Sequence, residues 1–303
     1  MLSYRHAFHA GNHADVLKHS VLLALLQYLK QKDGGVLMVD THSGAGLYRL
    51  DKEQALTSGE SLQGIHAVRQ AAANKPDKVP EMVQAYLDMM TGLHPEAREG
   101  ELRHYPGSPW IMQSALRPQD SLKVFEVHPS DARLLERNVA ELDNASQIQL
   151  NRKDGFTGLK ALLPPPSRRA LVLMDPSYEL KHDYASVVST MEDALRRFAT
   201  GTYAIWYPVI GRQEAHSLPK KLKSLAQTAG RSWLHTTLSI GADGAAPTAE
   251  SQRGKTKMRA SGMFVINPPY TLESGLRESL PWLVKAIGLG KGQGFTLESG
   301  EGR

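Results

Sequence analysis

The sequence predicts an α/β fold with a mostly parallel seven-stranded sheet and an inserted helical subdomain. Five short apolar runs are bounded by turn-forming residues and are typical of buried strands: 36–39, 122–125, 148–150, 171–174 and 203–206. Helical patterns separate most of these runs. Strands that alternate with helices pair in parallel and need helices on both faces, which indicates a doubly wound sheet.

The helices expected around the sheet cover 15–32, 131–142, 155–163, 184–198 and 213–229. Late in the chain we expect two further strands, 234–240 and 262–266, with only the loop 241–261 between them. Because no helix separates them, an antiparallel hairpin that closes the sheet is the simplest arrangement. The glycine-rich, polar end of the chain, 288–303, is expected to be a flexible tail.

The stretch 50–104 contains no convincing strand and is too long for an ordinary crossover connection. Helices are expected at 61–73 and 82–90, with a turn between them. We therefore predict a discontinuous domain made of 1–49 and 105–287, interrupted by a helical subdomain.

Composition limits the classes of function. The chain has 303 residues and no cysteine, which excludes disulfides, thiolate metal sites and cysteine nucleophiles. Lysine and arginine number 36 against 31 acidic residues, and the net charge of +5 favours a polyanionic partner. The N-terminus has no apolar core of signal-peptide length, and the apolar run 21–29 is too short to span a bilayer. We expect a soluble, cytoplasmic monomer with no membrane partner.

Acidic residues follow three successive strands of the predicted sheet. Asp40 ends the first strand, and the turn after it contains Gly44 and Gly46, which let the backbone approach a ligand. Glu126 ends the second strand, where a carboxylate can accept from two ribose hydroxyls, and Asp154 follows the third, where it can accept from an adenine amine. One such acid is more often a solvated residue or a helix cap. Three acids at the ends of successive strands predict a pocket for S-adenosylmethionine. The dinucleotide-binding motif needs a third glycine, and its absence disfavours a nicotinamide dinucleotide.

The tetrapeptide Asp175-Pro176-Ser177-Tyr178 follows the fourth strand, which lies beside the first at the point where doubly wound sheets bind ligands. An amine conjugated to a ring is a poor nucleophile. The Asp175 carboxylate and the Pro176 carbonyl can accept both amine hydrogens and favour a more tetrahedral nitrogen, and Asp175 can then take the proton. Tyr178 is expected to stack on the base. The alternative is an ordinary turn, for which these residue types are common.

A second tetrapeptide of the same kind, Asn267-Pro268-Pro269-Tyr270, follows the last expected strand. Its composition matches an amine methyltransferase motif better than that of the first. If the last strand is antiparallel, however, its carboxyl end lies at the opposite edge of the sheet, away from the three acids. We therefore interpret it as a structural turn.

With these residues identified, the chain resembles the ribosomal RNA large subunit methyltransferase J family along nearly its whole length. The most distinctive stretches are Ser3-Tyr4-Arg5-His6, Phe8-His9-Ala10-Gly11-Asn12, Ala14-Asp15-Val16-Leu17-Lys18-His19, Asp40-Thr41-His42, Tyr105-Pro106-Gly107-Ser108-Pro109, Glu126-Val127-His128-Pro129-Ser130 and Trp206-Tyr207-Pro208. The resemblance implies a Rossmann-like class I methyltransferase fold. It also implies methylation of an adenine N6 in 23S ribosomal RNA, with S-adenosylmethionine as the cofactor.

The resemblance assigns roles to particular residues. It implies cofactor contacts from His19, His42, Ser108, Glu126, Asp154, Gly155 and Asp175. It implies that Asp175 is catalytic, that Tyr4 lies near the substrate adenine and that Lys18 lies beside the pocket. No metal site is expected, because the spacings of the N-terminal histidines fit no standard site.

Ser177 departs from the family pattern, which has a second proline at this position. Loss of the ring loosens the loop that aims the Pro176 carbonyl and Tyr178 but leaves both acceptors in place, so we expect activity at a reduced level.

Three alternatives remain. The chain could be a guanine-N2 methyltransferase, a protein-amide methyltransferase, or a silent RNA-binding module that uses the basic loop 253–259 and Lys220-Lys221-x-Lys223.

Overall fold

The structure is a computed structural model that describes residues 5–92, 102–242 and 258–302. The strands are β1 (Leu37–Asp40), β2 (Leu47–Arg49), β3 (His104–Pro106), β4 (Ser121–Phe125), β5 (Ile148–Asn151), β6 (Ala170–Met174), β7 (Thr202–Pro208), β8 (Trp233–Ala242), β9 (Ala260–Ile266) and β10 (Lys291–Gly300). The α-helices are α1 (His13–Leu29), α2 (Glu53–Ser58), α3 (Ile65–Asn74), α4 (Glu81–Gly92), α5 (Ser108–Ser114), α6 (Pro129–Ala140), α7 (Gly155–Gly158), α8 (Lys181–Arg197), α9 (Gln213–Thr228) and α11 (Tyr270–Ile287). Short 3₁₀ helices are η1 (His6–Phe8), η2 (Glu60–Gln63), η3 (Pro76–Lys78), η4 (Ala145–Gln147) and η5 (Leu159–Leu162).

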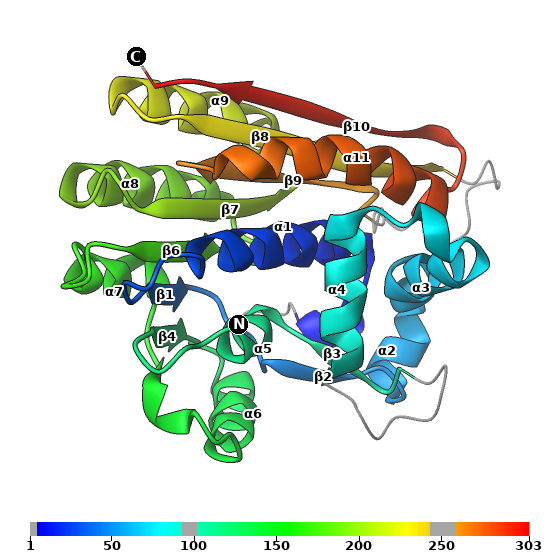
Figure 1. The fold of residues 1–303 in the computed structure, drawn as a ribbon, viewed down its shortest axis with the longest axis horizontal. Helices are drawn as coiled ribbons and strands as arrows, with labels where there is room; N and C mark the ends of the chain where they lie inside the picture. The colour runs from blue at the N-terminus through cyan, green and yellow to red at the C-terminus, as the bar shows by residue number, and fades with distance from the viewer. Residues whose placement is uncertain (1–4, 93–101, 243–257, 303) are drawn as a thin grey trace.

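One mixed sheet organises the molecule, with the strand order β10-β8-β9-β7-β6-β1-β4-β5. Strands β5, β4, β1, β6 and β7 are parallel, and β9 lies antiparallel between β7 and β8. In Figure 1, α1 and α11 cover the front of this sheet while α8 and α9 cover the back. The α/β fold class and the closing antiparallel hairpin are confirmed.

The expected count of seven strands is wrong by one, because the end of the chain is not a flexible tail. β10 pairs antiparallel with β8 over the register from Lys291↔Ala242 to Gly300↔Trp233, which makes an eight-stranded sheet. The segment is rich in glycine and mostly exposed, so its composition resembles that of a tail. A strand at the edge of a sheet needs only backbone partners on one side, and these do not depend on side-chain pattern.

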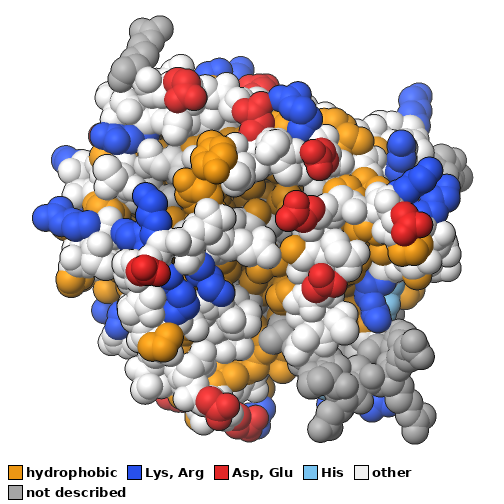
Figure 2. Space-filling view, viewed as in Figure 1, with side chains coloured by type: hydrophobic (Ala, Val, Ile, Leu, Met, Phe, Trp, Pro, Cys, Tyr) orange, Lys and Arg blue, Asp and Glu red, His pale blue; other side chains and the backbone are white. Residues whose placement is uncertain are grey.

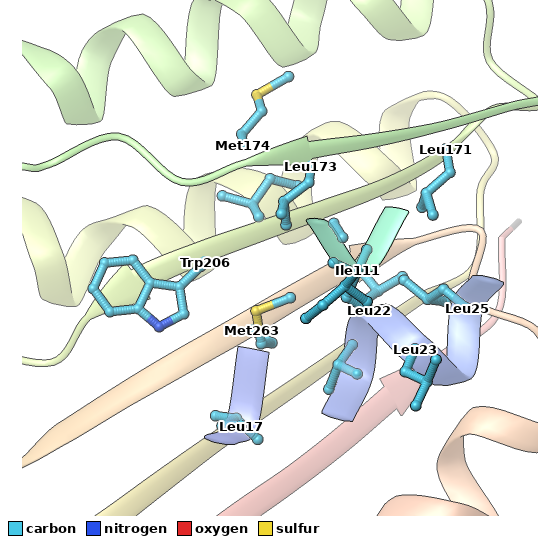
Figure 3. Close-up of a cluster of buried hydrophobic side chains, with 14 of the residues drawn as sticks. Leu17, Leu22, Leu23, Leu25, Ile111, Leu171, Leu173, Met174, Trp206 and Met263 are labelled. Atoms are coloured by element: carbon cyan, nitrogen blue, oxygen red, sulfur yellow. The ribbon is translucent and has the colours of Figure 1, made fainter. Parts of the chain in front are cut away.

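The core lies between the sheet and α1. Figure 3 shows Leu17, Leu22 and Leu25 of α1 facing Leu173 of β6 and Met263 of β9, and all five side chains are fully buried. α1 begins after Asn12, whose side chain accepts hydrogen bonds from the backbone nitrogens of the residues two and three positions later, at 2.9 and 3.0 Å. The Asn12 cap thus fixes the first turn of α1, and this helix carries the buried polar residues Asp15 and Lys18.

The described part of the inserted stretch contains the helices α2, α3 and α4, and the antiparallel pair β2–β3 flanks it. Its helix α4 packs on α1, and both α3 and α4 pack on α11. The side chains of Val68, Val83, Tyr86 and Met90 are buried in the same core as the sheet. None of the helices in the described part of the chain is long and apolar enough to cross a membrane.

Candidate active site

The loops that follow β1, β4 and β6 meet the start of α1 around one cavity of about 780 Å³, including its open mouth. Of the residues predicted for the site, those that line the cavity are Lys18, His19, His42, Ser108, Glu126, Asp175 and Pro176. Ser177 also lines it, as do His6, Tyr48 and His128, which sequence reasoning did not assign. Tyr4 lies outside the described residues.

The start of α1 supplies a buried charge network. The Nζ of Lys18 lies 2.9 Å from Asp15 Oδ1 and 2.5 Å from Asp175 Oδ2. Asp15 Oδ2 also accepts from the Nε2 of His6 and from the backbone nitrogen of Gly11, each at 2.9 Å. Lys18 thus connects a buried carboxylate of the helix to the tetrapeptide after β6.

Each of these charges is stabilised by its neighbours. Burial alone would raise the pKa of Asp15, but His6, Lys18 and His19 hold that pKa well below its ordinary value. Burial would likewise lower the pKa of Lys18, but Asp15 and Asp175 raise it above its ordinary value. Lys18 is therefore a fixed cation against Asp175.

The loop after β6 turns sharply at Tyr178, whose φ of 52° is unusual for a residue that is not glycine. The Tyr178 ring is 2% exposed, its hydroxyl donates to the carbonyl of Trp206 at 2.7 Å, and it contacts Tyr184. The prediction that Tyr178 stacks on a base is therefore contradicted, because the positive φ directs the ring into the core. Arg212, which sequence reasoning missed, donates to the Tyr178 carbonyl at 2.9 Å and holds the turn.

Glu126 joins the loops after β1 and β4. Its Oε2 accepts from the backbone nitrogen of Gly44 and its Oε1 from that of His128, both at 2.7 Å. Burial raises the pKa of Glu126 above its ordinary value. Gly44 and Gly46 have φ of 60° and 79°, which favours glycine at both positions of this turn.

Two histidines that line the cavity are neutral, and one polar atom each of His19 and Asp40 is buried without a hydrogen-bond partner among the described residues. Burial lowers the pKa of His19 to about 3 and that of His42 to about 4, so both rings are neutral. His19 Nδ1 hydrogen-bonds Tyr105 at 2.8 Å, whereas its Nε2 has no hydrogen-bond partner among the described residues. Burial raises the pKa of Asp40 to about 7, and the Oδ1 of Asp40 accepts from the backbone nitrogen of His42 at 3.2 Å. The Oδ2 of Asp40 is buried and has no hydrogen-bond partner within the described ranges.

Asp154 and Gly155 lie at the start of α7 and do not line the cavity. The Asp154 carboxylate accepts from the backbone nitrogens of Phe156 and Thr157, at 3.4 and 2.9 Å. This is the helix-cap role weighed for such acids above. At Gly155 a Cβ would collide with the backbone carbonyl of Thr41, so glycine allows the loops after β5 and β1 to touch.

The second tetrapeptide is a structural turn, as predicted. β9 runs antiparallel to β7, which places Asn267 at the opposite edge of the sheet from Asp175. The Asn267 side chain donates to the carbonyls of Ala199 and Gly201 at 2.8 and 2.7 Å. Its φ of 53° is one that asparagine tolerates better than most residues.

Comparison with known proteins identifies the family. A family model described as ribosomal RNA large subunit methyltransferase D, RlmJ, matches residues 33–297. The chain belongs to this family. As an RlmJ-family protein it is a ribosomal RNA methyltransferase, as the resemblance implied.

Two relatives and one solved structure extend this match. The ribosomal RNA large subunit methyltransferase J of Escherichia coli is 46% identical over 283 residues, which cover 93% of each chain. The protein of the same name from Haemophilus influenzae is 45% identical over 287 residues, which cover 95% of this chain and 94% of the relative. The crystal structure of a Legionella pneumophila protein, 29% identical, aligns with a TM-score of 0.80 over 97% of this chain and 98% of its own. The RlmJ fold therefore extends over nearly the whole molecule.

Proposed function

We propose that this protein transfers a methyl group from S-adenosylmethionine to the exocyclic N6 of an adenine in 23S ribosomal RNA, and that Asp175 is the catalytic residue. The observation that carries the proposal is the position of Asp175. It lies at the carboxyl end of β6, lines the cavity that Glu126 and the glycine turn after β1 also line, and is paired with the buried Lys18. The names of the two bacterial relatives support a ribosomal RNA of the large subunit as the substrate.

The residues of the cavity fit S-adenosylmethionine. Its ribose hydroxyls need acceptors, and Glu126 has lone pairs beyond the two that its backbone donors use. Its amino acid end is polar, and the cavity lining includes His19, whose buried Nε2 has no hydrogen-bond partner among the described residues. When bound, the cofactor supplies an electrophilic methyl group.

Asp175 and Pro176 act on the amine. We expect Asp175 to accept one amine hydrogen through the oxygen that Lys18 does not hold, and the Pro176 carbonyl to accept the other. Both hydrogen bonds favour a more tetrahedral nitrogen with its lone pair available for in-line attack. The carboxylate then takes the proton that the methylated nitrogen loses. Lys18 holds one oxygen of Asp175 at 2.5 Å and so fixes the orientation of the carboxylate.

Activity should be measured with 23S ribosomal RNA from cells that lack the protein, with labelled cofactor, and with mass spectrometry of the digested nucleosides. We expect the wild type to form N6-methyladenosine. Asp175→Ala should lower turnover by about 10²–10³-fold and leave cofactor affinity within roughly tenfold, because the carboxylate acts mainly on the amine.

Asn267→Ala is the matched control, since it changes the equivalent residue of the second tetrapeptide. This variant should lose stability, because two carbonyls lose their donor, but keep the turnover of the folded protein. Formation of N2-methylguanosine, labelling of protein instead of RNA, or unchanged turnover of Asp175→Ala would each contradict the proposal.

A further inference from the structure

A second groove lies away from the active site, between the end of α3 with η3 and the end of α11. It encloses about 800 Å³, including its open mouth, and we call it the basic groove. Its residues include Lys75, Lys78, Lys285 and Trp282, together with the small side chains of Ala71 and Ala286. The two alanines leave the groove open, and the partly buried Trp282 packs against the core.

The lysines of the basic groove are exposed, and none of them forms an ion pair with any part of the chain that the structure describes. Elsewhere, charged side chains pair along their own helices, as Arg277 does with Glu273 and Arg197 with Asp193. Figure 2 shows Lys and Arg side chains gathered on the right-hand side of the face that carries α3 and the end of α11. Asp77 lies between Lys75 and Lys78 on η3, so the three lysines leave the groove with a net positive charge around Trp282. Positive charge around an aromatic residue is the kind of surface that single-stranded nucleic acids bind.

The inserted helix α3 connects the basic groove to the active site. At its start, the backbone nitrogen of Ile65 donates to the carbonyl of Gly11 at 2.9 Å, immediately before the helix that carries Lys18. At its other end α3 reaches Lys75. The ten residues of α3 span about 15 Å at 1.5 Å per residue, which corresponds to roughly four phosphate spacings along a stacked strand. A strand with one base in the cavity therefore needs at least about four nucleotides to reach the groove, because the path from the cavity to Ile65 adds to the length of α3.

Other basic segments fit this role less well. Lys223 of α9 is already engaged, with its Nζ 4.5 Å from the centroid of the Trp233 ring. Arg253, Lys255 and Lys257 lie outside the described residues. The basic groove combines lysines of the inserted helices with Lys285 and Trp282 of α11.

We infer that the basic groove binds the phosphate backbone of the substrate RNA a few nucleotides from the methylated base, with Trp282 as an aromatic surface for one flanking base. This inference rests on the proposed function, because it assumes that RNA enters the cavity. The groove would contribute to affinity for long RNA and not to the chemistry itself.

The test replaces Lys75, Lys78 and Lys285 together by alanine and measures binding to unmodified 23S ribosomal RNA at several salt concentrations. Each lost phosphate contact lowers the slope of log K against log salt by about 0.7–0.9, so we expect a slope smaller by about 2 to 3. Extrapolated from 1 M salt, this corresponds to an affinity about 50- to 300-fold lower at 0.15 M. The KM for RNA should rise, whereas kcat and the cofactor affinity should stay unchanged.

The matched control replaces three exposed lysines elsewhere, Lys32, Lys160 and Lys291, by alanine, and should leave the slope within about one unit of the wild type. Replacement of the three groove lysines by arginine should restore wild-type binding, since the positive charge is kept. A short RNA that fills only the cavity should bind the groove variant and the wild type equally.

Equal salt slopes for the groove variant and the control would overturn the inference. So would unchanged binding to free RNA combined with weaker methylation of assembled ribosomal particles, because the groove would then contact a protein. If the wild type methylates no RNA at all, the proposed function fails. If it methylates RNA and the groove variant behaves like the control, only the inference fails.

Discussion

Replacement of Lys18 by methionine tests the buried charge network most directly. Methionine keeps most of the side-chain volume but removes the ammonium group that lies 2.9 Å from Asp15 and 2.5 Å from Asp175. Loss of one partner from a buried ion pair costs about 3–5 kcal/mol. Asp15 keeps its bonds from His6 and Gly11, and the Asp175 side chain is 14% exposed and can reach water. We therefore expect the lower end, about 3 kcal/mol of lost stability at pH 8.

The loss in Lys18→Met should depend on pH. In the wild type the folded pKa of Asp15 lies below its unfolded value, so Asp15 contributes stability above a pH of about 4 and loses it only as the pH falls through the folded pKa. Without the Lys18 ammonium group, less positive charge opposes the effect of burial on Asp15. The pKa of the Asp15 carboxyl in the folded state therefore rises. Protonation at lower pH then relieves the unpaired charge, so the difference from wild type should be smaller at pH 5 than at pH 8.

Urea unfolding followed by tryptophan fluorescence at both pH values measures this effect. Lys32→Met is the control, since Lys32 is exposed, and it should stay within about 0.5 kcal/mol of the wild type. A loss below about 1 kcal/mol at pH 8, or an equal loss at both pH values, would refute the reasoning.

Three further substitutions test the loops around the cavity. Tyr178→Phe removes the hydrogen bond to the Trp206 carbonyl and should cost about 1 kcal/mol in urea unfolding with the KM for RNA unchanged; a large rise in KM at constant stability would restore the stacking role. Gly155→Ala should weaken cofactor binding by about tenfold or more in calorimetry, because its Cβ displaces the Thr41 loop, and wild-type affinity would show that the loop contact is dispensable. Ser177→Pro restores the family residue and should preserve or raise kcat, whereas lost turnover in a folded protein would contradict our view of this loop.

The parallel part of the sheet could be predicted from the sequence because its strands are buried on both faces. Their apolar runs need no tertiary information, and the order of strands then brings the acids at their ends to one edge. This logic identified Glu126 and Asp175 as cavity residues and rejected Asn267 in favour of a structural turn. Strand direction therefore distinguished two tetrapeptides that composition could not.

Features that depend on distant partners could not be predicted. Asp15 at the start of a helix has the pattern of an ordinary acid near a helix N-terminus, and only the fold places it between His6 and Lys18. The helix α11, which contains Pro281, was not predicted, although α9 was predicted despite its internal Pro219. The buried Tyr178 combines a positive φ with hydrogen bonds to the Trp206 carbonyl and from Arg212, and no local pattern signals these distant partners.

The pairing of β10 with β8 has a consequence for how the protein behaves in concentrated solution. β8 is long and largely buried, and without β10 its open backbone would be a template for strands of other molecules. β10 presents a poorer template, because it contains several glycines and the charged side chains of Lys291 and Glu298. A chain truncated before residue 291 should therefore self-associate in light scattering, although it keeps every residue of the active site. Monodisperse scattering from that chain would show that β8 needs no such cover.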